Sequence, residues 1–255
     1  MVDLWRRTFD DNEDYINNFI NLFGEKIIVY RVDGITIGML SLLDVSLNGY
    51  KGGYIYALAV DKQYQKRGVA TSLLTFAQET MLNSGYKFSI LVPEPYDSLE
   101  AFYKKFGFDC EVSLYTTVIE ENSFAGTANV VPLNEDEYYY FRKIQPNVLV
   151  HSKKMFEYIY EDLNSDGFRF LKVQSDTFFG YCICIIKDDY VIIKEAIPFE
   201  QSDNIANQVC EALNIKKAIL ISSKGKQKHP FALMKCFDNI KSNVYANLLL
   251  DSFGG

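Results

Sequence analysis

Histidine, basic charge and long apolar runs are all scarce in this chain. It holds two histidines among 255 residues, and its formal net charge is −7. So few histidines argue against a His-rich metal site, and we expect no metal. The negative charge disfavours a surface that follows the phosphates of a nucleic acid. No apolar run is long enough to span a membrane. We therefore expect neither nucleic acid nor membrane as a partner, and the oligomeric state stays open.

The five cysteines indicate neither a disulfide framework nor a zinc site. Their number is odd, and they lack the paired spacing of zinc ligands. Cys182 and Cys184 lie two residues apart in a strand-like segment, where they would share one face as buried thiols. The first residues also lack the apolar segment of a signal peptide. We therefore expect a cytoplasmic location.

The most informative segment is residues 54–71. Its apolar first part predicts a strand, and Gln65-Lys66-Arg67-Gly68 then opens a helix with apolar residues at helical spacing. Free amides at a helix N-terminus, a glycine without a Cβ and two cations together can hold a phosphate or pyrophosphate. Taken alone, the local chemistry fits an ordinary strand, turn and helix with a solvated basic cap equally well.

The first fifty residues predict a helix and a hairpin. Residues 9–23 have the apolar pattern of an amphipathic helix, with Asp10 and Asp11 placed to cap it. Asp33-Gly34 separates two apolar runs, which is a strong signal for a tight hairpin turn.

A third helix is expected after residue 96. Asp97 and Glu100 resemble a capping box at its start, and Gly107 would end it. Residues 121–128 have the small and polar composition of a linker. We place the domain boundary there, with one domain at 1–121 and another at 129–255.

The second half repeats the plan of the first half weakly. A helix-rich region is followed by three strands, a helix and a strand, and Gly38 and Gly180 fall at comparable places in their strands. The segment around His229 reads as a lysine-rich surface loop. The expected elements of this half are strands at 170–173, 180–186 and 190–196, a helix at 204–213 and a strand at 217–221.

Two segments resemble the GNAT superfamily of acetyl-coenzyme A-dependent N-acetyltransferases. Residues 58–70 fit its strand and Gln/Arg-x-x-Gly-x-Gly/Ala signature, and residues 102–108 fit a helix-end motif that follows one strand later. The resemblance implies an α/β (α+β) fold with a mixed, mostly antiparallel sheet flanked by helices. It further implies a second, degenerate GNAT-like half, because residues 197–204 contain neither a glycine nor a basic pair.

The resemblance also implies roles for individual residues. The backbone of Leu58, Ala59 and Val60 would lie along the acetyl and pantetheine arm of acetyl-coenzyme A. Tyr103 would protonate the departing thiolate, although a core ring on the apolar face of its helix would give the same pattern. The residues implied to hold the pyrophosphate are Gln65, Lys66, Arg67, Gly68, Val69, Ala70 and Thr71.

Some positions depart from the family pattern. Tyr96 stands where many members have an asparagine. Neither the strand expected at 54–60 nor the one expected at 87–92 carries an acidic residue that could act as the base. Asp44, Glu94 and Glu195 are candidates, and we assign none of them.

The implied reaction is transfer of the acetyl group from acetyl-coenzyme A to a primary amine by direct attack. A non-catalytic acyl-coenzyme A sensor is the alternative that the missing base favours. Aminoacyl transfer from a charged transfer RNA is a third reading, which the negative charge disfavours. The acceptor is not fixed by these residues.

Overall fold

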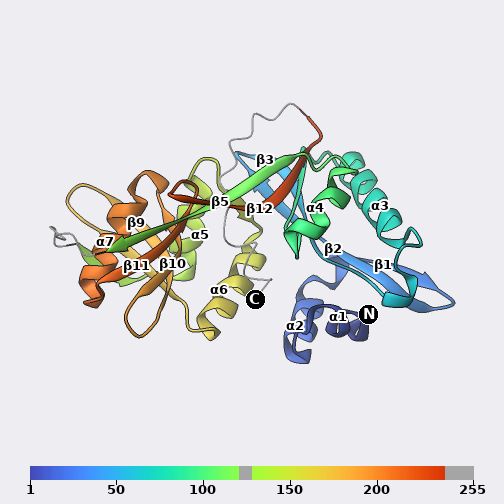
Figure 1. Cartoon of the computed structure of the whole chain (residues 1–255), viewed down its shortest axis with the longest axis horizontal. Helices are drawn as coiled ribbons and strands as arrows, with labels where there is room; N and C mark the ends of the chain where they lie inside the picture. The colour runs from blue at the N-terminus through green and yellow to red at the C-terminus, as the bar shows by residue number, and fades with distance from the viewer. Residues whose placement is uncertain (121–127, 239–255) are drawn as a thin grey trace. The chain divides into compact units, whose positions relative to one another are not determined.

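The computed structural model describes residues 1–120 and 128–238, which form two compact units (Figure 1). Unit 1 comprises Met1–Cys110 and the segment that begins at Leu233, and unit 2 begins at Glu111 and reaches Ala232. The division into separate domains at 1–121 and 129–255 stays a prediction, and the predicted linker lies almost entirely outside the described residues.

Unit 1 is a five-stranded sheet between two pairs of helices. Its helices are α1 (Val2–Phe9), α2 (Glu13–Phe23), α3 (Val69–Asn83) and α4 (Tyr96–Lys104), with short 3-10 turns η1 (Gly24–Lys26) and η2 (Lys62–Tyr64). Its strands are β1 (Ile27–Val32), β2 (Ile35–Leu47), β3 (Tyr50–Val60), β4 (Phe88–Leu91) and the end of β12 (Gln227–Cys236). The strand order is β1-β2-β3-β4-β12, in which β3 and β4 are parallel and the other neighbours antiparallel.

The two faces of this sheet bury different cores. α3 and α4 cover one face with an apolar cluster that includes Leu73, Leu74 and Tyr103. On the other face, α1 and α2 bring Trp5 and Phe19 onto the ring of Tyr56 from β3. Figure 1 shows α3 on one side of β1 and β2, and α1 and α2 on the other.

The first helix differs from the prediction, whereas the hairpin is confirmed. Asp10 does not cap a helix at 9–23 but ends α1 in a left-handed conformation, with φ 60°. α2 begins after Asn12, whose side chain accepts a hydrogen bond from the Tyr15 amide at 2.7 Å. The Asp33-Gly34 turn joins β1 to β2, and both residues have positive φ.

The predicted capping box of α4 is also wrong. The helix begins after Pro95 and has no side-chain cap, so neither Asp97 nor Glu100 makes the expected bond. The turn that follows α4 does contain Gly107, at φ 83°. A capping box is present instead at the start of α5 in unit 2, between Asn134 and Glu137.

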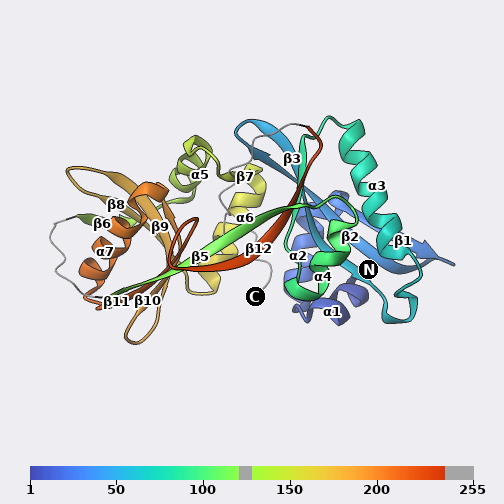
Figure 2. The ribbon, with the colours of Figure 1, turned by 45° about the horizontal axis from the view of Figure 1, so that its top comes forward.

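The last described strand was predicted as a loop. β12 includes His229, and its final residues pair antiparallel with β4 in unit 1, where Leu233 is fully buried. Lysine-rich composition hid this strand, because only its end contributes apolar residues to a core. Figure 2 shows β12, drawn in red, ending in unit 1.

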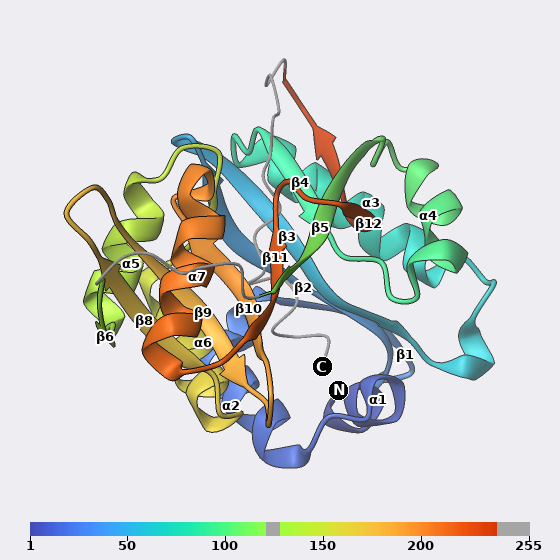
Figure 3. The same cartoon turned by 60° about the vertical axis from the view of Figure 1, so that its left-hand side comes forward.

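Unit 2 has the same kind of architecture. Its helices are α5 (Glu135–Ile144), α6 (Lys153–Ser165) and α7 (Ser202–Leu213), with a 3-10 turn η3 (Phe199–Gln201). Its strands are β5 (Cys110–Glu120), β6 (Asn129–Pro132), β7 (Leu149–His151), β8 (Arg169–Gln174), β9 (Phe179–Ile186), β10 (Val191–Ile197) and β11 (Lys217–Ser222). The sheet runs β6-β8-β9-β10-β11-β5, and only the pair β10 and β11 is parallel among its described pairings. Figure 3 shows α7 lying across these strands.

Both units place a helix crossover after three antiparallel strands. In unit 1, α3 leads from β3 to the parallel strand β4; in unit 2, α7 leads from β10 to the parallel strand β11. A Cβ on Gly38 of β2 would meet Val69 of α3 at 2.6 Å, and one on Gly180 of β9 would meet Ile205 of α7 at 2.9 Å. The corresponding glycines support the proposed internal repeat. The predicted mixed, mostly antiparallel sheet with flanking helices is confirmed.

Candidate functional site

A cavity of about 470 Å³ lies in unit 1 between the end of β3 and the helices α3 and α4. It gathers the two segments that the sequence singled out, because Gly68 from the loop and Tyr103 from α4 line the same space. The lining residues are Leu58, Val60, Tyr64, Gln65, Lys66, Gly68, Val69, Ala70, Thr71, Leu99, Phe102 and Tyr103.

The strand that enters the cavity is bulged. Met39 of β2 pairs with Ala59 and Ser41 pairs with Tyr56, so one β2 residue faces two residues of β3. Ala57, in this bulge, has φ 53°, which is unusual for a residue with a Cβ. The single β2 residue cannot form regular ladder bonds with both of the β3 residues that it faces. The bulge therefore interrupts the sheet beside Leu58, where the cavity begins.

The loop after β3 presents backbone amides that are not used elsewhere. Lys66 has φ 60° and Gly68 has φ 84°, and Gly68 is the residue before α3. Among the described residues, the backbone amides from Gln65 to Thr71 donate no hydrogen bond. The first hydrogen bond of α3 runs from the Ser72 amide to the carbonyl of Gly68. Such a loop suits an anion.

Gly68 leaves the approach to these amides open. A Cβ built on this glycine would meet nothing within 4 Å, so packing does not explain the absence of a side chain. The positive φ does explain it, since other residues are strained there. Lys66 lines the cavity and adds positive charge. Arg67 does not line it; its guanidinium lies 5.6 Å from the centre of the Tyr64 ring.

Tyr103 forms the opposite wall. Its side chain is 6% exposed and packs edge-on against Phe102 and Phe108. Burial raises the pKa of Tyr103 to about 12, so the hydroxyl is protonated at neutral pH. In the part of the chain that the structure describes, this hydroxyl has no hydrogen-bond partner, and it can therefore serve a ligand.

Most of the predicted cofactor residues line the cavity, and two do not. Ala59 is 1% exposed, and neither Ala59 nor Arg67 is among the residues that line the cavity. The wall formed by Tyr64, Leu99 and Phe102 was not predicted. Leu99 and Phe102 belong to an apolar stripe on α4, and such a stripe does not distinguish a cavity wall from a core.

None of the acidic candidates for a general base lines this cavity. Asp44 is bonded to Lys26 at 2.6 Å and to the Tyr86 hydroxyl. Glu195 lies in unit 2 and is buried against Arg142. Glu94 is exposed and does not line the cavity. Among the residues that the structure describes, the site therefore offers a phenol and amides but no carboxylate.

Two features are absent from the described residues. No group of three His, Cys, Asp or Glu side chains there could hold a metal ion. Over the same residues, every helix is too short or too polar to cross a membrane.

A bulged strand leads into a helix N-terminus with free amides, and a buried phenol stands across the same space. Residues 1–108 match the sequence model of the Acetyltransferase (GNAT) family. This match covers less than half of the chain and falls within unit 1.

Solved structures support the fold over nearly the whole chain. A GCN5-related N-acetyltransferase from Kribbella flavida has a TM-score of 0.71 at 12% identity, covering 93% of this chain and 68% of that one. A conserved Enterococcus faecalis protein described as a probable N-acyltransferase has a TM-score of 0.74 at 13% identity, covering 92% and 69%. No protein with a curated function matches the sequence.

Proposed function

We propose that this chain transfers an acetyl group from acetyl-coenzyme A to a primary amine. One observation carries the proposal: the free amides of the loop and the protonated phenol of Tyr103 line the same cavity. Proteins of the GNAT family use acetyl-coenzyme A. The acceptor amine is not identified by these contacts.

The residues present fit the parts of acetyl-coenzyme A. The amides from Gln65 to Thr71 would hold the pyrophosphate, with Lys66 adding charge and Gly68 leaving the backbone accessible. The pantetheine arm would lie along the end of β3, against Leu58 and the backbone up to Val60. Once bound, acetyl-coenzyme A supplies an activated thioester.

Tyr103 is placed to act as the acid. Its raised pKa keeps the phenol protonated at neutral pH, so its hydroxyl is available as a donor. The Tyr103 hydroxyl would donate to the thiolate that departs from the thioester. Backbone donors freed by the bulge near Leu58 would polarise the thioester carbonyl.

The acceptor must lose a proton before it attacks. A lysine-like amine has a pKa of about 10.4 and is mostly protonated at neutral pH. Because no carboxylate lines the described cavity, we propose that this proton leaves through water or directly to solvent. The reaction should therefore speed up as the pH rises towards the pKa of the acceptor.

We propose one cofactor site per chain. The turn after β10 in unit 2 runs through Pro198 and η3 into α7, without the glycine and basic pair of the loop in unit 1. Unit 2 would then be a GNAT-like half without cofactor binding.

Replacement of Tyr103 by phenylalanine tests the catalytic proposal and separates it from a sensor. The variant Tyr103→Phe should lower kcat by about a hundredfold while leaving the Kd of acetyl-coenzyme A unchanged. Release of free coenzyme A with a panel of amines measures the first quantity and calorimetry the second. Tyr96→Phe removes a hydroxyl from the same helix outside the cavity and should leave kcat unchanged. If the native protein binds acetyl-coenzyme A but turns over no amine, the protein is a sensor.

A further inference from the structure

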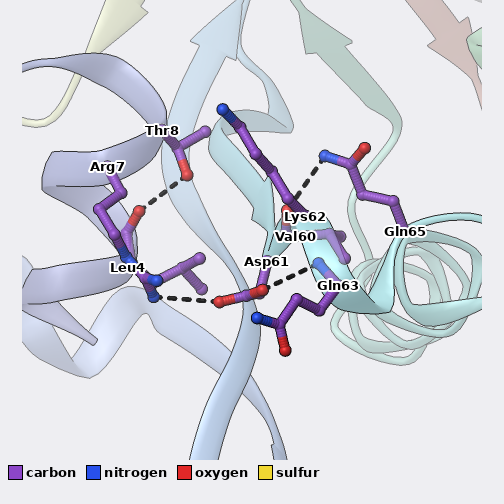
Figure 4. A pocket seen from close by; sticks show the side chains of 8 residues that line it. All are labelled: Leu4, Arg7, Thr8, Val60, Asp61, Lys62, Gln63 and Gln65. Carbon is purple, nitrogen blue, oxygen red and sulfur yellow. Dashed lines mark hydrogen bonds and ion pairs between the residues drawn. The ribbon is translucent and has the colours of Figure 1, made fainter.

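A second cavity, of about 590 Å³, adjoins the first one on the α1 side of the strand end (Figure 4). The two cavities share Val60 and Gln65 as lining residues. α1 contributes one wall of the second cavity, and the first turn after β3 contributes the other. The lining residues are Leu4, Arg7, Thr8, Val60, Asp61, Lys62, Gln63 and Gln65.

The carboxylate in this cavity is already neutralised. Asp61 accepts from the Arg7 guanidinium at 3.0 Å and from the Gln63 amide at 3.0 Å. Its side chain is 17% exposed, compared with 64% for Arg7. Figure 4 shows Arg7 reaching Asp61 from α1. The ion pair therefore links α1 to the turn after β3, and the neutralised carboxylate repels an incoming anion only weakly.

Several donors in the cavity remain available. The Lys62 ammonium and the Gln63 carboxamide make no hydrogen bond or ion pair within the described residues, and Arg7 uses Nε and Nη2 but not Nη1. The other polar groups are already occupied. The Thr8 hydroxyl donates to the carbonyl of Leu4 at 2.7 Å, and the side-chain carboxamide of Gln65 donates to the carbonyl of Val60 at 3.3 Å. The cavity thus carries an excess positive charge in a protein of net charge −7.

We propose that this second cavity binds an anionic group, either a phosphate or a carboxylate, through Lys62, Arg7 and Gln63. Charge-assisted hydrogen bonds from an ammonium and a guanidinium are the strong contacts for such groups. Because the cavity adjoins the proposed thioester site, the anion has two sources. It is an acidic group on the acceptor amine, or the 3′-phosphate of coenzyme A; this assignment of the source rests on the proposed function.

Titration with inorganic phosphate tests the site itself. At constant ionic strength, the amide resonances of Lys62 and Gln63 should shift saturably in the native protein. The variant Lys62→Gln should bind phosphate about tenfold more weakly at this site, because one charge-assisted hydrogen bond is lost. Lys187→Gln removes the same charge from an exposed position of unit 2 and should change nothing. Shifts that do not saturate, or equal losses in both variants, would overturn the proposal.

Two further comparisons decide the source of the anion. If the anion is the 3′-phosphate, Lys62→Gln weakens the binding of coenzyme A and leaves the binding of dephospho-coenzyme A unchanged. If it is the acceptor, Lys62→Gln raises KM for amines with a carboxylate or phosphate and not for their neutral amides. Should neither change, both assignments of the source are wrong, and the phosphate titration alone decides whether the cavity binds an anion. The phosphate titration remains decisive even if the protein proves not to bind acetyl-coenzyme A, so the two proposals fail separately.

Discussion

Arg142 and Glu195 form an ion pair that is buried within unit 2. The guanidinium contacts both carboxylate oxygens, one of them at 2.6 Å, and the two side chains are 0% and 2% exposed. The Tyr181 hydroxyl donates to the same carboxylate at 2.6 Å, and Arg142 also donates to the carbonyl of Leu149. The acidic residue in the apolar strand β10 is thus explained by its pairing with a buried arginine. Glu195 neutralises the charge of Arg142 and accepts hydrogen bonds from Arg142 and Tyr181 in this core.

Breaking this pair on one side should be costly. Arg142→Met leaves the Glu195 carboxylate buried without its partner, which lowers the free energy of unfolding by about 3–5 kcal/mol. Urea denaturation measures this difference. The double variant Arg142→Leu with Glu195→Leu removes both charges and should recover much of the loss. A single variant as stable as the native protein would contradict the proposed role of the pair.

Lys235 should hold the helix that carries Tyr103. Its ammonium donates to the carbonyl of Phe106 at 2.8 Å and to Gln78 of α3 at 2.9 Å, and Gln78 donates to the same carbonyl. Lys235→Met should therefore reduce stability by about 1–2 kcal/mol and lower kcat, since α4 is less firmly fixed to α3. Lys87→Met breaks an exposed ion pair in the same unit and is the control, with at most about 1 kcal/mol expected. Thermal unfolding and steady-state kinetics measure the two effects.

Equal losses in Lys235→Met and Lys87→Met would contradict this account. Such a result would mean that Lys235 of β12 contributes only general stability and does not position α4.

Asp44 should make stability depend on acid pH. Burial alone would raise the pKa of its carboxyl, but hydrogen bonds from Lys26 and Tyr86 hold it below the usual value. A lowered pKa in the folded state stabilises the protein above the unfolded value of about 3.9, and this contribution is lost as the pH falls through the folded pKa. Asp44→Asn should therefore cost about 1 kcal/mol at pH 7, a value discounted for partial exposure, and progressively less below pH 4.

Urea midpoints at pH 7, 5 and 3 for the native protein and Asp44→Asn test this dependence. Glu79→Gln, at an exposed position of α3, is the control for loss of one acidic group. A difference between native protein and Asp44→Asn that is constant down to pH 3 would refute the assignment.

The sequence predicted what local chemistry determines. The Asp33-Gly34 hairpin and the helix after Gly68 both follow from residues whose backbone preferences decide the structure. The cap of α2 was misplaced, because Asp10, Asp11 and Asn12 are all good capping residues and only packing selects among them. Asp11 instead accepts a hydrogen bond from the indole of Trp5 at 2.7 Å.

Features that depend on distant pairing could not be read from the chain. The end of β12 is a strand because Leu233 to Cys236 pair with β4, more than a hundred residues earlier. The cavity beside Asp61 depends on Arg7 of α1, 54 positions away in the sequence. For Tyr103, the periodicity predicted a buried face, and the shared cavity with Gly68 became visible only in the structure.

Binding of acetyl-coenzyme A to two matched glycine variants tests the central claim most directly. Gly68 and Gly85 both have positive φ, 84° and 75°, and both have open space where a Cβ would stand. Gly68→Val and Gly85→Val therefore introduce similar backbone strain at opposite ends of α3. We predict that Gly68→Val weakens the binding of acetyl-coenzyme A at least about tenfold, and that Gly85→Val binds it as tightly as the native protein. Equal affinity in the two variants, or no binding by the native protein, would contradict it.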